Sequence, residues 1–139
     1  MDRRVVLDKL ESLRRCVERV EARRPETVAA LEQDLDLQDI LSLNITRAVQ
    51  VSVDVAAHVV AGLDVPAPTT MGETFDALAR TGVVSPELAE RMRAAVGFRN
   101  VAVHAYQTID WEIVMAICHR HLNDFRTFAR AVADALPDP

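Results

Sequence analysis

Glycine and aromatic residues are scarce in this chain of 139 residues, which has four glycines and an aromatic share of 4%. Sandwiches and barrels need many turns and are rich in aromatic and β-branched residues, so this composition argues against an all-β fold. Half of the residues are hydrophobic, and alanine, valine, leucine and arginine dominate, a mixture that favours helices. We expect an all-α protein with a single domain over residues 1–139.

Cysteine is also scarce, and no pattern of metal ligands is visible. Cys16 and Cys118 form no C-x-x-C pair and lie at no metal-site spacing, so we interpret them as buried, reduced thiols. His119 and His121 are two residues apart on an expected helix, so they do not share a face and make a poor metal pair. We therefore expect neither a metal nor another cofactor.

Long apolar runs are absent as well. No secretory leader and no run long enough for a membrane span can be recognised, which predicts a cytoplasmic protein without a membrane partner. The formal net charge is −5, which argues against a general nucleic-acid binder with a broad basic surface. An enzyme that meets RNA at one small positive site remains compatible with this charge. Arg91 and Arg93 either add positive potential to such a site or belong to a solvated face.

Apolar periodicity predicts an up-and-down bundle of four to five helices. The first helix, from Asp2 to about Arg23, has a heptad-like apolar stripe. The region from Thr27 to Gly62 is helical in character, and its part from Leu37 to Leu63 is apolar on almost every side, so it should be central. A lone bundle of this size would struggle to cover both helices, which favours a homodimer. The residues of the first stripe are Val6, Leu10, Leu13, Val17 and Val20.

Prolines, glycines and capping residues divide the second half of the chain. His104 and Tyr106 fall in the expected connection before the last helix, where alternate side chains point the same way if the backbone is extended. In chain order we expect a loop over 65–71 and a short helix over 75–82 capped by Thr70 or Thr74. A helix from Ser85 to about Phe98 or slightly beyond, a turn or loop over 101–108, and a last helix over 111–136 capped by Asp110 should follow.

One short segment, Arg99-Asn-Val-Ala-Val-His-Ala-Tyr106, combines groups suited to RNA cleavage without a metal. Histidine titrates near neutrality, so His104 can take the proton of a 2′-hydroxyl or protonate the leaving 5′-oxygen. Arg99 can offset the charge that builds on the phosphate. Asn100 can orient either group, and Tyr106 offers a hydroxyl or a surface on which a base can stack. Roughly 0.4 R-x4-H pairs are expected by chance in such a chain, so the surrounding residues carry the signal.

The string R-N-x-x-x-H-x-Y in an all-α chain of this length resembles the HEPN superfamily, and more narrowly its HepT-type toxins. The resemblance implies that Arg99 and His104 are the catalytic pair of an R-x4-H ribonuclease motif, with Asn100 as the polar residue after the arginine. It also implies a homodimer in which two such motifs face each other across a cleft. Fold, activity and dimer are thus expectations that the resemblance brings to these residues.

The same resemblance implies a partner and a modification. In HepT-type toxins the tyrosine of H-x-Y receives AMP from the antitoxin, a minimal nucleotidyltransferase (MNT), and that position here is Tyr106, the only tyrosine of the chain. AMP at this position would place a bulky anion beside Arg99 and His104 and repel RNA. We therefore expect an endoribonuclease toxin that an MNT-type antitoxin neutralises.

Two alternatives remain open on sequence grounds. Arg47, Gln50, Asp54 and His58 form a polar stripe that either faces the cleft, with Asp54 orienting Arg99 or His104, or is a solvated face with an internal ion pair. The second alternative concerns function: the protein could be a catalytically silent helical module that partners a minimal nucleotidyltransferase. In that case the arginine, histidine and tyrosine of the motif have only structural roles.

Overall fold

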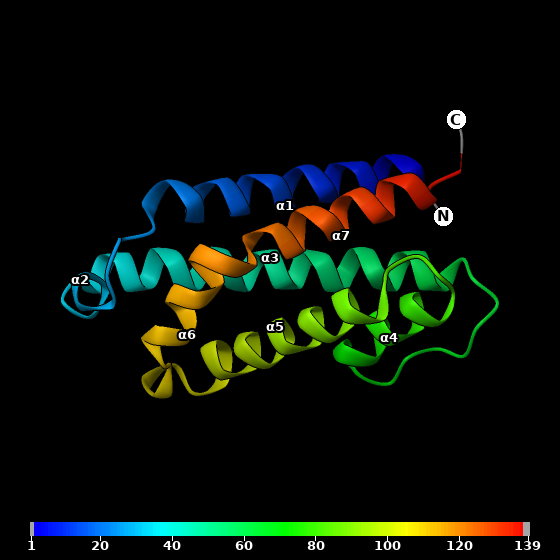
Figure 1. The fold of residues 1–139 in the computed structure, drawn as a ribbon. Helices are drawn as coiled ribbons and strands as arrows, with labels where there is room; N and C mark the ends of the chain where they lie inside the picture. Colours follow the sequence, from blue (N-terminus) through cyan, green and yellow to red (C-terminus); the bar gives the residue numbers. More distant parts are fainter. Residues whose placement is uncertain (1, 138–139) are drawn as a thin grey trace.

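The computed structural model describes residues 2–137, and over that range it contains helices and no β-strand (Figure 1). This confirms the expected all-α fold. The elements are α1 (Arg3–Arg23), α2 (Val28–Glu32), α3 (Leu35–Ala61), α4 (Met71–Arg80), α5 (Pro86–His104), a 3-10 turn (Tyr106–Thr108), α6 (Trp111–Ala116), one wider π-helical turn (Ile117–His121) and α7 (Leu122–Ala135).

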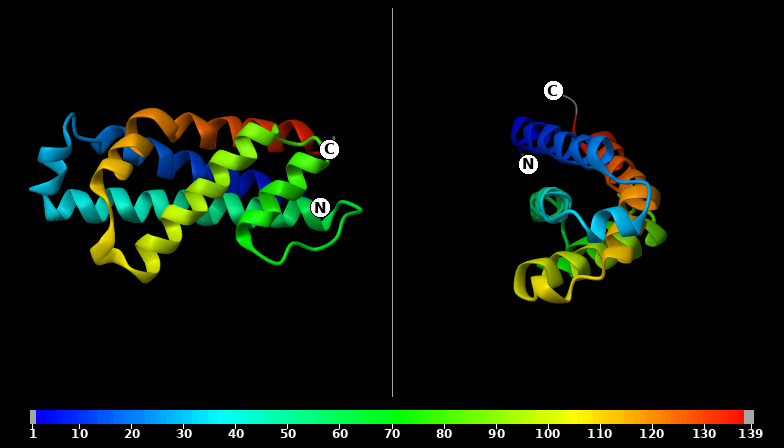
Figure 2. Two further views of the ribbon diagram at one scale, coloured as in Figure 1. Left: turned by 60° about the horizontal axis from the view of Figure 1, so that its bottom comes forward. Right: turned by 90° about the vertical axis from the view of Figure 1, so that its left-hand side faces the viewer.

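The long helix α3 lies at the centre of the bundle, and α1, α4, α5 and α7 all contact it. In the end-on view of Figure 2, α1 and α5 lie on opposite sides of α3 and α7 lies on a third side. The fourth side of α3 is not covered by another helix of the described chain. Exposed or half-buried residues follow one another along this side, which we call the open face of α3; they are Asp36, Asp39, Leu43, Arg47, Gln50 and Asp54.

The apolar stripe of α1 is buried within the protomer. All five of its residues are at most 9% exposed, and they belong to the same core as the inner residues of α3 and α7. This stripe is therefore no reason to expect a second copy, because α3 and α7 already cover it. The dimer stays a prediction, and its support must come from other surfaces.

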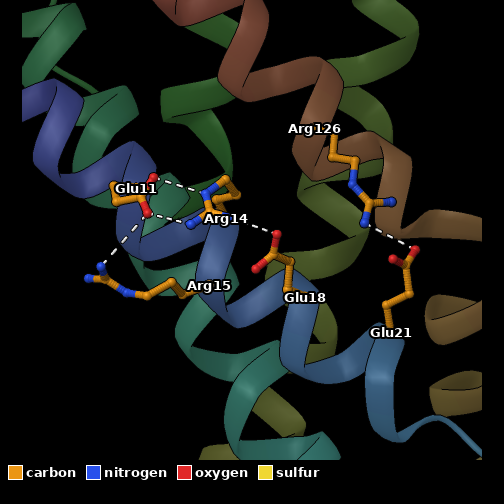
Figure 3. A network of polar contacts seen from close by, with 6 residues as sticks. All are labelled: Glu11, Arg14, Arg15, Glu18, Glu21 and Arg126. Atoms are coloured by element: carbon orange, nitrogen blue, oxygen red, sulfur yellow. Dashed lines mark hydrogen bonds and ion pairs between the residues drawn. The ribbon is translucent and has the colours of Figure 1, made fainter.

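Several exposed side chains of α1 form ion pairs (Figure 3). Arg14 binds Glu11 and Glu18 on its own helix. Arg126 of α7 donates to Glu21 at 3.1 Å and so joins the two helices. Exposed pairs of this kind contribute little to stability, so packing of the apolar core holds these helices together.

Most element starts follow the expected caps. The Ser85 hydroxyl accepts from the backbone N–H of Leu88, and the carboxylate of Asp110 accepts from that of Glu112. Thr70, rather than Thr74, caps α4. These side chains satisfy backbone donors that a helix start leaves without partners.

The end of α5 differs from the sequence prediction. The helix was expected to end at about Phe98 or slightly beyond, with a turn or loop over 101–108, but it continues to His104. No proline interrupts this stretch, and Phe98 is buried in the core. A side chain at Gly97 would meet nothing within 4 Å, so no close packing requires a glycine at this position. Arg99 and His104 therefore lie on one helix, and the turn or loop expected over 101–108 is wrong for residues 101–104.

The last predicted helix is interrupted by the π-helical turn at Ile117–His121. The carbonyl of Cys118 accepts a hydrogen bond of 2.7 Å from Arg24 Nη1, and His119 Nε2 lies 2.7 Å from the carbonyl oxygen of Pro25. Both contacts tie this turn to the connection after α1. None of the helices within residues 2–137 is both long and apolar enough to cross a lipid bilayer.

Candidate active site

The R-x4-H segment occupies the last turns of α5. Residues five positions apart on an α-helix lie about 140° apart around its axis, so Arg99 and His104 start from different faces. Asn100 and His104 are four positions apart and share a face. Asn100 Oδ1 accepts a hydrogen bond of 3.1 Å from Arg99 Nη1. Asn100 thus connects the guanidinium group to the face that carries His104.

Arg99 is the most buried of the three side chains. Asn100 and His104 are exposed, whereas Arg99 is half-buried. Its Nε atom is buried and has no hydrogen-bond partner among the described residues. A buried N–H without an acceptor is costly, and an anion beside the guanidinium would remove that cost. The arrangement suits a group that meets a phosphate.

Tyr106 follows directly in the 3-10 turn, and its ring packs edge-to-face on Trp111 with 6.1 Å between the ring centroids. Its hydroxyl donates to Asp39 Oδ1 of α3 at 2.6 Å. The pKa of Tyr106 lies above its ordinary value, mainly because of partial burial and then because of the bond to Asp39. The nearby Ser42 hydroxyl has a smaller, opposite effect on this pKa. That hydroxyl is buried and has no well-aligned partner among residues 2–137. The side chain is 37% exposed, so the phenol is held in place yet open to solvent.

A groove of about 350 Å³ lies beside Tyr106, between α3 and the end of α5. Its lining is mainly apolar, and Leu43 and Val103 on its walls are 50% and 47% exposed. Large exposed apolar side chains that gather beside a polar site are typical of interaction surfaces. The other lining residues are Asp39, Ser42, Thr46, Ala102 and Tyr106.

Asp54 does not contact the motif within the protomer. Gln50 Nε2 donates to it at 3.0 Å, and Lys9 Nζ lies 4.0 Å from its carboxylate. These contacts match the alternative of an internal ion pair on the polar stripe. The alternative in which Asp54 orients Arg99 or His104 stays a prediction. It requires that Asp54 meets the motif of a second copy of the chain.

The other basic and imidazole side chains singled out in the sequence lie in separate contacts. Arg91 pairs with Asp124 at 2.8 Å, and His121 Nδ1 lies 3.1 Å from the same carboxylate. Arg93 lies 3.4 Å from a carboxylate of α4. Because these arginines are paired, they add little positive potential to the motif. Within the described residues, no group of three or more histidine, cysteine, aspartate or glutamate side chains is placed to hold a metal ion.

Two features of the site were not predicted from the sequence. Asp39 meets Tyr106 across 67 positions of the chain, and no local pattern signals such a contact. An arginine groove of about 330 Å³ lies between α1 and α3, where Arg15, Arg19 and Arg47 surround Cys16. Arg47 is on the open face of α3 that also carries Asp39. Arg15 lies 3.9 Å from Glu11, so the positive charge of this groove comes mainly from Arg19 and Arg47.

Comparison with known proteins decides the family. The sequence profile of the family described as Ribonuclease HepT-like matches residues 10–132. The chain belongs to the HepT-like ribonuclease family. The resemblance drawn from the R-N-x-x-x-H-x-Y string is thereby confirmed.

Individual relatives of this HepT-like protein agree with that assignment. A protein of Shewanella oneidensis called mRNA nuclease HepT is 29% identical over 124 residues, 89% of this chain and 92% of the relative. A protein of Aphanizomenon flos-aquae called tRNA nuclease HepT is 29% identical over 105 residues, 76% of this chain and 69% of the relative. The tri-AMPylated HEPN toxin of Shewanella oneidensis, solved in complex with its MNT antitoxin, superposes with a TM-score of 0.88 at 28% identity, covering 96% of this chain and 99% of that one.

Proposed function

We propose that this HepT-like protein is a metal-independent endoribonuclease toxin of a HEPN/MNT toxin–antitoxin pair. One observation carries the proposal: on the last turns of α5, Asn100 accepts a hydrogen bond from the Arg99 guanidinium and lies one helical turn before the exposed His104. A fixed cation and a titratable imidazole are the two groups that cleavage of an RNA phosphodiester needs without a metal.

The residues have distinct roles in this proposal. His104 takes the proton of the 2′-hydroxyl or protonates the leaving 5′-oxygen, and Arg99 binds the phosphate oxygens as negative charge builds on them. Asn100 orients the guanidinium. Attack by the 2′-oxygen on phosphorus breaks the bond to the 5′-oxygen, so the products end in a 2′,3′-cyclic phosphate and a 5′-hydroxyl.

The active form is proposed to be a homodimer. The side chains of Arg99 and His104 leave the helix about 140° apart around its axis. Two motifs that face each other can therefore surround a phosphate better than one. The apolar residues beside the motif, Leu43 and Val103, are exposed in the protomer and offer the surface on which a second copy can pack. The arginine groove can hold neighbouring backbone phosphates of the RNA.

Tyr106 is proposed to be the site at which an MNT-type antitoxin attaches AMP. It is the only tyrosine, it is 37% exposed, and it follows His104 by two residues. The tri-AMPylated state of the similar Shewanella toxin supports this regulation. AMP on Tyr106 would bring negative charge to the motif and repel the RNA backbone.

RNA cleavage by the purified protein in EDTA tests the nuclease. We expect the wild type to cleave, while His104→Ala and Arg99→Ala lose at least 100-fold, an effect of the size that general acid–base groups and charge-stabilising groups have. His119→Gln is the matched control, because this exposed histidine lies on the π-helical turn and a glutamine can keep its contact with the Pro25 carbonyl. A wild type no faster than the two motif variants overturns the nuclease and leaves the silent binding module, whereas activity lost only in EDTA points to a metal.

Mass spectrometry after incubation with an MNT-type nucleotidyltransferase and ATP tests the modification. We expect the intact mass to rise by one or more AMP groups in the wild type and to stay unchanged in Tyr106→Phe. A gain that survives this substitution, or no gain in the wild type, contradicts Tyr106 as the acceptor.

A further inference from the structure

The hydrogen bond between Tyr106 and Asp39 has a geometry that matters for nucleotidyl transfer. The two oxygens lie 2.6 Å apart, within the range of an O–H group that donates to an ionised carboxylate. The phenolic proton is therefore directed at Asp39, and the lone pairs of the phenol oxygen are directed elsewhere.

The residues around Tyr106 hold its phenol in one orientation. Asp39 is exposed on the second turn of α3, and the Tyr106 ring is held from the other side by Trp111. The buried Ser42 hydroxyl lies in the same groove. The carboxylate and the hydroxyl come from α3 and the ring contact comes from Trp111 of α6, so the phenol is positioned before any partner arrives.

We propose that Asp39 orients Tyr106 as the nucleophile for AMPylation and accepts its proton during the transfer. This inference rests on the proposed modification of Tyr106. The phenol oxygen attacks the α-phosphorus of ATP, the bond between that phosphorus and the bridging oxygen to the β-phosphorus breaks, and pyrophosphate leaves. The phenolic proton passes to the carboxylate of Asp39.

A chemical reason favours a base supplied by the toxin itself. Partial burial and the bond to Asp39 raise the pKa of Tyr106 above its ordinary value, so the free phenolate is rare near neutral pH. The proton must then leave together with the formation of the phosphorus–oxygen bond, and this needs an acceptor within hydrogen-bond distance. Protein kinases use an aspartate in the same way to accept the proton of a substrate hydroxyl.

The test compares the rates of AMP transfer to wild type and Asp39→Asn by one preparation of an MNT-type nucleotidyltransferase with ATP. At pH 7 we expect Asp39→Asn to be modified about 100-fold more slowly, the usual size of a general-base effect. Without the carboxylate, the reaction depends on phenolate formed in solution. The rate for the variant should then rise about tenfold per pH unit below the pKa of the phenol, and the gap to wild type should narrow at pH 9.5.

Three controls separate this role from a structural one. Asp36→Asn removes a charge from the first turn of the same helix and should be modified at the wild-type rate. Asp39→Glu keeps the carboxylate and should recover most of the rate and the shallow pH profile. RNA cleavage and melting temperature, measured without the nucleotidyltransferase, should be unchanged in Asp39→Asn; Asp39→Ser serves as a second variant should the asparagine fail to fold.

The outcomes are distinct. A slow, steeply pH-dependent transfer to Asp39→Asn with unchanged RNA cleavage supports the proposal. Equal rates and equal pH profiles for wild type and Asp39→Asn overturn it while leaving Tyr106 as the acceptor. Parallel loss of transfer, cleavage and thermal stability shows that the bond is only structural and also overturns it. No mass gain in the wild type instead contradicts the proposed modification itself.

Discussion

Arg99 and His104 lie on different faces of the same helix, and Asn100, which binds the Arg99 guanidinium, shares the face of His104. Asn100 is one position after Arg99, accepts its Nη1–H at 3.1 Å, and precedes His104 by one helical turn. We therefore propose that the polar residue after the arginine positions the cation. This relationship exists because α5 continues through the motif to His104.

Asn100→Ala should reduce kcat for RNA cleavage by about 10- to 100-fold, because a misplaced catalytic group costs about that much in rate. Asn100→Gln keeps an amide on a longer stem and should recover part of the loss. Both rates are measured with a fluorescent RNA at saturating concentration, and the melting temperature is measured in parallel to confirm folding. Full activity in Asn100→Ala would show that Arg99 needs no such anchor.

Neutralising the arginine groove should weaken RNA binding without changing the chemical step. For the double variant Arg19→Gln/Arg47→Gln we expect KM for RNA to rise about tenfold at unchanged kcat, and the salt dependence of binding to become shallower, because fewer counterions are released. Arg14→Gln is the matched control, since Arg14 is paired with two glutamates on α1. Equal KM values in the double variant and this control would exclude the groove from the RNA path.

A charge on the open face of α3 should dissociate the proposed homodimer. Leu43→Asp places a carboxylate on a wall of the groove beside the motif, where the wild-type leucine is 50% exposed. We expect a dimer for the wild type and a monomer with little cleavage activity for Leu43→Asp, measured by light scattering and RNA cleavage. Leu7→Asp is the control, because Leu7 is 39% exposed on α1. A Leu43→Asp protein that remains dimeric would place the interface elsewhere.

Stability should fall at alkaline pH because of Cys118. Burial raises the pKa of its thiol from 9.0 to about 11. The native state therefore keeps the thiol proton at pH values where the unfolded chain releases it, so the stability is fully present below about pH 9 and is lost as pH rises towards 11. The expected loss by pH 11 is about 2–3 kcal/mol.

Urea unfolding at several pH values measures this loss. Cys118→Ala should be less stable at pH 7 but should show a flatter pH dependence, while Cys16→Ala should keep the wild-type slope. Parallel pH profiles for wild type and Cys118→Ala would assign the alkaline loss to other groups.

The sequence by itself determined the elements and the family. Periodic apolar residues mark the buried sides of α1 and α3, and caps such as Ser85 and Asp110 mark helix starts, because both signals act within a few turns of chain. The eight residues from Arg99 to Tyr106 pointed to the HepT-like family, which the profile match confirms. The end of α5 was missed because no strong local signal marks it: no proline follows Phe98 before the helix ends at His104.

Only the tertiary structure decided which distant residues meet. Asp39 and Tyr106 are 67 positions apart, and Arg47 joins two arginines of α1 across the groove. Such contacts depend on how α1 and α5 pack against α3, and helix packing is set by the whole core rather than by local pattern. Packing also covered the α1 stripe, which the sequence alone left without a partner, and placed the open face of α3 beside the motif.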